Sequence, residues 1–170
     1  YFYGRYRDID LVLAMRIHSM SPAMGIGRPV VPLVYPGRMT GYLKKIGLCY
    51  RHLDEPKKAL SCFRQAEYLD PEDLHTEVTI GHCLLEMEQF DEALKSYFKV
   101  EYLDPTNHKV WRPIAWCSFV AGKFDQARKY YGKLLEDDPT QFDYMNFGHL
   151  EWCEGNRQEA INLYMKHLKT

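Results

Sequence analysis

A period of 34 residues runs through most of this 170-residue chain and restricts its fold more than any other feature. Three series keep the interval, shortened once to 33: a small residue early in each copy, an alanine later, and a proline at the end. The small residues are Gly47, Gly81, Ala115 and Gly148, the alanines are Ala59, Ala93, Ala127 and Ala160, and the prolines are Pro71, Pro105 and Pro139. Repetition on this scale predicts stacked supersecondary units.

Each copy has the pattern of two antiparallel helices. Small residues such as Gly47 and Ala59 allow two helices to approach closely, and aromatic residues such as Phe63 fill the space towards the next copy. Asp-Pro ends the second helix, because the residue before proline is pushed out of the α region. One helical hairpin cannot bury its apolar face alone, so neighbouring hairpins must stack on it.

The pattern within each copy resembles the tetratricopeptide-repeat signature, a W-x2-L-G-x2-Y first helix followed by A-x3-F and a proline. The copies read Leu43, Ile46, Gly47, Tyr50, Ala59, Phe63, Ala66, Pro71; Glu77, Ile80, Gly81, Leu84, Ala93, Tyr97, Val100, Pro105; Trp111, Ile114, Ala115, Ser118, Ala127, Tyr131, Leu134, Pro139; and Tyr144, Phe147, Gly148, Glu151, Ala160, Tyr164. This family implies an all-α, right-handed superhelix. We expect four hairpins, at about residues 40–73, 74–107, 108–140 and 141–170, and the low divergence of the copies suggests a bacterial source.

Pro113 departs from the pattern. It lies about one turn into the expected first helix of the third copy, where it removes a backbone donor and crowds the preceding turn. We therefore expect that helix to start late or to bend.

Residues 1–39 differ in composition, with five arginines but no lysine or glutamate. An apolar stripe at Ile9, Leu13, Ile17 and Met20 favours a helix over Tyr6 to Met20, either independent or as the second helix of a degenerate repeat. The prolines between Pro29 and Pro36 favour an extended conformation. This segment is either a linker, native or introduced with the chain, or a strand that lies against the solenoid and covers a binding surface.

Composition points to a soluble globular chain with a net charge of −1, which gives no general attraction to nucleic acid or anionic membranes. No apolar run approaches the roughly 20 residues of a membrane-spanning helix. Cys49, Cys83 and Cys117 recur in one slot, which predicts a packing position, and an odd total of five cysteines argues against a disulfide framework. We expect reduced thiols and a cytoplasmic location, although a chain starting at Tyr1 leaves a removed signal peptide open.

In tetratricopeptide-repeat proteins the concave groove is lined mainly by the first helices, and transferring those slots gives a groove rich in basic, aromatic and histidine side chains. The resemblance thus implies a peptide-binding set of Lys44, Lys45, Arg51, His75, His82, Lys109, Arg112, Trp116, Phe119, Asn146, His149 and Trp152. Such a groove suits a peptide with carboxylates and apolar anchors, because aromatic and arginine side chains are frequent hot spots. The alternative is that Phe119 and Trp152 pack between adjacent first helices.

One branch of the family holds the C-terminal carboxylates of heat-shock chaperones in a clamp of lysines and asparagines. Lys44 and Lys109 occupy two of its five slots. Leu48, Thr79 and Pro113 occupy the other three and cannot hold a carboxylate as lysine or asparagine would. We therefore reject chaperone-tail binding.

The sequence suggests no metal site, cofactor or catalytic centre. His149 and Cys153 share one helix face and His82 adjoins Cys83, but zinc needs three or four converging ligands. No H-E-x-x-H helix, phosphate loop or nucleophile elbow is present. We expect no enzyme.

The predicted function is a protein-interaction module, an adaptor, scaffold or co-chaperone that binds a peptide or protein segment in its concave groove. Self-association through the terminal repeats is a further expectation. Two alternatives stay open: a secretion-type chaperone, which four good copies disfavour, and a helical module of a larger enzyme or sensor.

Overall fold

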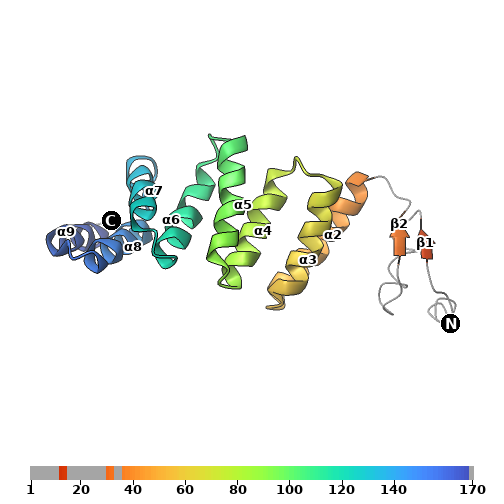
Figure 1. The fold of residues 1–170 in the computed structure, drawn as a ribbon, viewed down its shortest axis with the longest axis horizontal. Helices are drawn as coiled ribbons and strands as arrows, with labels where there is room; N and C mark the ends of the chain where they lie inside the picture. The colour runs from red at the N-terminus through yellow and green to blue at the C-terminus, as the bar shows by residue number, and fades with distance from the viewer. Residues whose placement is uncertain (1–11, 15–29, 33–35, 169–170) are drawn as a thin grey trace.

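The computed structural model describes residues 12–14, 30–32 and 36–168, and in this part of the chain eight α-helices form four antiparallel hairpins. The first helices of the hairpins are α2 (Pro36–His52), α4 (Leu74–Glu86), α6 (Trp111–Val120) and α8 (Gln141–Cys153). The second helices are α3 (Pro56–Leu69), α5 (Phe90–Leu103), α7 (Phe124–Glu136) and α9 (Arg157–His167). The hairpins stack in a row (Figure 1), which confirms the predicted right-handed solenoid. None of the described helices is long and apolar enough to cross a membrane.

Two short strands precede the helices. β1 (Val12–Ala14) pairs in parallel with β2 (Val30–Pro32), with Val12 opposite Val30. The helix predicted over residues 6–20 is therefore wrong at β1, where β-prone apolar residues find a partner strand. The rest of that predicted helix lies outside the described residues.

The predicted extended conformation of the proline segment is confirmed at β2, but α2 already begins at Pro36, ahead of residue 40. Proline is well tolerated in the first turn of a helix, where its missing N–H has no partner to lose. Coverage of a binding surface by this segment stays a prediction, since most of residues 1–35 lie outside the described part.

In the hairpins, an aromatic ring of the second helix packs against a small residue of the first helix. A Cβ atom added to Gly47 would lie 2.8 Å from the Phe63 ring, and one added to Gly81 would lie 2.5 Å from the Tyr97 ring. Gly148 faces Tyr164 in the same way. Glycine fills the slot in these three hairpins because the two helices approach closely, whereas the third hairpin accommodates Ala115.

The turns inside the hairpins repeat one geometry. The second residue after the first helix adopts a left-handed conformation in every described copy, with φ values of 57° at Asp54, 59° at Glu88, 73° at Gly122 and 86° at Gly155. The N–H of the next residue bonds to the carbonyl five residues earlier, as in Gln89 to Leu84 at 2.9 Å. This is a Schellman cap, which satisfies the last carbonyls of the helix.

Ion pairs join the second helices of consecutive hairpins. Lys99 Nζ lies 2.8 Å from Glu67 Oε1, and the equivalent pair one period later, Lys133 and Glu101, is 3.2 Å apart. The pairs are partly exposed, so each contributes modestly to stability, but their recurrence shows that α3, α5 and α7 lie side by side.

Pro113 has the predicted effect. A 3-10 turn, η2 (His108–Val110), replaces the start of the first helix, and α6 begins only at Trp111. Pro113 then lies in the first turn of α6, where the missing N–H costs little.

The shared cysteine slot is a packing position in two of three copies. Cys83 and Cys117 are buried, and burial raises the pKa of each thiol to about 11, whereas Cys49 is exposed. The prediction is wrong for Cys49, which lies on α2 in the first of the described hairpins. All five cysteines are free.

Candidate functional site: the face of the first helices

The predicted groove residues lie on α2, α4, α6 and α8, with Lys109 in η2. Their surroundings divide them into three groups: cations held by carboxylates of the next first helix, polar side chains without such a partner, and aromatic side chains.

Three of the predicted cations are engaged between hairpins. Lys44 pairs with Asp73 and Arg51 with Glu86, which joins α2 to α4. Arg51 Nε lies 3.1 Å from Glu86 Oε1, and this hydrogen bond raises the pKa of the guanidinium. These charges hold neighbouring hairpins in register and are compensated within the chain.

Arg112 forms the most buried of these pairs. Its Nε and Nη2 donate to the two carboxylate oxygens of Asp143 at 2.8 and 2.9 Å, and the Asp143 side chain is fully buried. Burial alone would raise the pKa of Asp143, but hydrogen bonds from Arg112 and Thr140 outweigh it and hold the pKa below its ordinary value. Removing Arg112 would leave a buried charge without its partner, a large penalty.

Lys45 and Lys109 are exposed and have no ion-pair partner among the described residues. His75 is exposed and Asn146 is half-buried. Of the predicted polar set, these residues keep the most freedom to meet a ligand.

Two histidines rest on the aromatic residues that close their hairpins. The Tyr97 hydroxyl and His82 Nδ1 are 2.8 Å apart, and His149 packs edge-on against Tyr164 with 5.6 Å between ring centroids. Burial, with the nearby positive charge of Arg51, lowers the pKa of His82. The fold therefore favours the neutral form of His82, and the contact with Tyr97 orients its ring.

Aromatic side chains dominate the exposed apolar surface of α6 and α8. Trp116 is 38% exposed and lies 6.0 Å from the partly buried Phe119, centroid to centroid. Trp152 is 51% exposed, with the Arg157 guanidinium 5.9 Å above its ring. Phe119 packs against the core beside Phe124 of its own hairpin, and Trp152 is more exposed, so packing between adjacent first helices stays a prediction.

Sequence reasoning missed Phe142 and Val120, which are also exposed on α8 and α6. Phe142 is 66% exposed and falls in the slot that His75 and Lys109 occupy in earlier copies. Extending that slot to the fourth copy would have found it.

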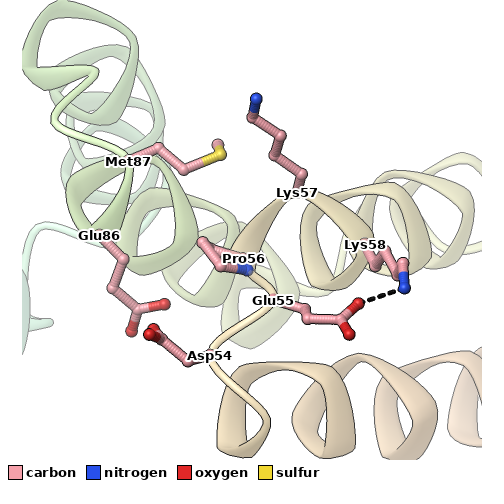
Figure 2. A pocket seen from close by; sticks show the side chains of 7 residues that line it. All are labelled: Asp54, Glu55, Pro56, Lys57, Lys58, Glu86 and Met87. Atoms are coloured by element: carbon pink, nitrogen blue, oxygen red, sulfur yellow. Dashed lines mark ion pairs between the residues drawn. The ribbon is translucent and has the colours of Figure 1, made fainter.

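A separate open cavity of about 480 Å³ lies where the turn of the first hairpin meets the end of α4. Figure 2 shows the Asp54 and Glu86 side chains directed toward one another and Glu55 paired with Lys58. Pro56 completes the turn beside these charges. No predicted groove residue lines the cavity, although Glu86 is also the partner of Arg51.

Among residues 12–14, 30–32 and 36–168, no cluster of three or more histidine, cysteine or acidic side chains could hold a metal ion. The described histidines and cysteines are distributed along the solenoid, two or three to a hairpin.

Two family profiles, each described as a tetratricopeptide repeat, match the chain, one at residues 45–73 and 78–107 and the other at 114–140. The chain belongs to the tetratricopeptide-repeat family. The profiles do not reach the fourth copy, yet α8 and α9 form a hairpin with the same contact between Gly148 and Tyr164.

Solved structures of MamA have the same fold. A crystal structure of MamA is 19% identical with a TM-score of 0.71, covering 76% of this chain and 77% of that one. The MamA 41-end structure from Desulfovibrio magneticus RS-1 is 16% identical with a TM-score of 0.73, covering 76% and 74%. Another MamA crystal structure is 17% identical with a TM-score of 0.73, covering 90% and 79%. At these identities the likeness concerns the fold alone. A comparison with curated protein sequences gave no match.

Membership of the tetratricopeptide-repeat family makes this chain a protein-interaction module, and proteins of this family are generally not catalytic. Stacked hairpins of this kind present an extended surface to a partner chain.

Proposed function

We propose that this tetratricopeptide-repeat protein is an adaptor or scaffold that holds a segment of a partner protein against α6 and α8. The observation that carries the proposal is the exposure of Trp116 and Trp152 on consecutive first helices, with Phe119 beside Trp116. Large aromatic side chains exposed on one surface are common centres of binding energy.

The charge arrangement refines the chemistry of the partner. Lys44, Arg51 and Arg112 are compensated by carboxylates of the next hairpin. Apolar and aromatic anchors are therefore the main requirement, and Lys45 and Lys109 are the cations that remain for an acidic side chain of the partner. We further propose that the protein lies in the cytoplasm, which is consistent with its five free cysteines. We also propose that it has no catalytic activity.

Selection of peptides from a phage-displayed library against the intact chain tests this proposal. The selected peptides should carry aromatic or aliphatic residues, and the double variant Trp116→Ala/Trp152→Ala should weaken their binding by about tenfold or more. Ile161→Ala, which removes an exposed apolar residue from α9, is the matched control and should bind like the parent chain. Equal binding by the double variant would refute the proposal.

A further inference from the structure

A second surface, on the edge where the second helices end, has the opposite chemistry to the face of the first helices. Tyr68 and Tyr102 are 86% and 85% exposed, and they occupy the same slot in α3 and α5. Each lies in the sequence Glu-Tyr-Leu-Asp-Pro. Tyrosine is enriched at protein interfaces, because its ring gains from being covered while its hydroxyl keeps a polar partner.

The two tyrosines belong to one continuous surface. The ion pair between Lys99 and Glu67 joins α5 to α3 close to both tyrosines, because Glu67 directly precedes Tyr68 and Lys99 lies three residues before Tyr102. In Figure 1 the turn from α3 to α4 and the turn from α5 to α6 lie on the same edge of the solenoid. We call this surface, made of Tyr68, Tyr102, Asp70, Glu72 and Asp104, the tyrosine edge.

Carboxylates surround the tyrosines. Asp70 and Asp104 are the C-cap residues of α3 and α5, and Glu72 follows in the first turn; none of the three has an ion-pair partner among the described residues. Asp104 accepts hydrogen bonds from Thr106 only, at 3.1 Å from the backbone and 2.6 Å from the hydroxyl. The edge continues with Glu136, the last residue of α7, and Asp138 after it, both exposed.

This placement of charge is unfavourable within the chain alone. A helix C-terminus carries a partial negative charge and is stabilised by cations, yet the last turns of α3 and α5 contain no basic residue. Lys99 and Lys133, one turn back, are held by Glu67 and Glu101. The lysines near the edge are therefore already paired. The carboxylates of Asp70, Glu72 and Asp104 keep their negative charge without an ion-pair partner among the described residues.

We propose that the tyrosine edge binds a lysine- and arginine-rich segment of a partner protein. Cationic side chains of that segment lie over the Tyr68 and Tyr102 rings and pair with Asp70, Glu72 and Asp104. A cation gains on the face of an aromatic ring and again near a carboxylate. The surface is distinct from the aromatic face of α6 and α8, so one chain can hold two partner segments of different chemistry.

Fluorescence anisotropy with labelled decapeptides tests the proposal: one of arginine, lysine and serine, one of glutamate and serine, and one neutral and apolar. The basic peptide should bind, and binding should weaken as salt rises. The variant Tyr68→Ala/Tyr102→Ala should bind it about tenfold less tightly, from two exposed cation–π contacts. Tyr68→Phe/Tyr102→Phe keeps the rings and should bind like the parent chain.

Two controls separate the tyrosine edge from general electrostatic attraction. Asp70→Asn/Glu72→Gln should weaken the basic peptide more than Glu88→Gln/Glu92→Gln, which removes two exposed carboxylates from the region where the second hairpin turns. Equal effects of the two variants, unchanged binding by Tyr68→Ala/Tyr102→Ala, or preference for the acidic or apolar peptide would overturn the proposal. So would self-association in analytical ultracentrifugation that the tyrosine double variant abolishes.

Discussion

The second hairpin, α4 and α5, and the third, α6 and α7, place different residues in the same slots. In the second hairpin Gly81 lies against Tyr97, whose hydroxyl bonds to His82. In the third hairpin the slot of His82 holds Trp116, and the hydroxyl of Tyr131 is buried without a hydrogen-bond partner among the described residues. The framework is therefore kept while the groove surface changes from polar to aromatic.

This comparison shows that packing determines which residues occupy the slots inside a hairpin, whereas the slots on its face are less restricted. Tyr97 and Tyr131 are both almost completely buried, so packing keeps the ring in both hairpins. The residue above the ring is free to vary, even where the change leaves the Tyr131 hydroxyl unsatisfied. Such a change costs stability and is retained when the exposed side chain has a use.

The largest expected effect is at the small slot of the second hairpin, compared with a glycine of the third hairpin that lies outside that slot. Gly81→Ala places a methyl group 2.5 Å from the Tyr97 ring and should lower the free energy of unfolding by about 2 kcal/mol. Gly132→Ala, in α7 with no atom near the new methyl group, is the control and should raise it by about 0.5–1 kcal/mol. Urea denaturation measures both, and an undiminished midpoint for Gly81→Ala would show that the hairpins are not held at this contact.

The two buried tyrosine hydroxyls should respond differently to removal. Tyr97→Phe removes the bond to His82 and should cost about 1 kcal/mol, whereas Tyr131→Phe removes an unpaired hydroxyl and should be neutral or stabilising. Thermal unfolding of the two variants provides the comparison. Equal losses would mean that the Tyr131 hydroxyl is bonded in solution.

The turn slot offers a further contrast. Glu88 adopts a φ of 59° where the next hairpin has Gly122 at 73°. Glu88→Gly should relieve strain and stabilise by about 0.5–1 kcal/mol, and Gly122→Ala should destabilise by about 1 kcal/mol. Chemical denaturation should show opposite signs for the two substitutions; the same sign in both would contradict a shared left-handed turn.

The smallest expected effect is a pH dependence confined to the second hairpin. Because the pKa of His82 is lowered in the fold, the unfolded chain takes up a proton first as pH falls. The stabilising contribution is complete above the unfolded pKa of about 6.5 and is lost as pH falls from there towards the folded pKa. The parent chain should therefore lose more stability than His82→Gln on acidification from pH 7.5 to 5.5; identical losses would exclude His82.

The periodic residues were sufficient to predict the fold, because each recurring small or aromatic residue has one role in a stacked hairpin. Pro113 likewise predicted the late start of α6. The strand at Val12–Ala14 was not predictable from its own residues, because it depends on pairing with Val30–Pro32.

The candidate site was less accessible to sequence reasoning. The slots located Trp116 and Trp152, but the partners of the cations lie some 30 residues away in the sequence. Arg112 counted as a ligand-binding cation until the position of Asp143 was known. Ion pairing across a helical interface depends on side-chain direction as well as on the repeat register.

Indole N–H signals in a nitrogen–proton NMR spectrum test the central claim most directly, because the chain has only three tryptophans. Trp111 is stacked on His108 at 3.9 Å between ring centroids and lies under Lys133, away from the proposed surface. Addition of a peptide selected on the intact chain should shift the signals of Trp116 and Trp152 and leave that of Trp111 in place. Movement of the Trp111 signal alone, or of none, would contradict binding at the aromatic face of α6 and α8.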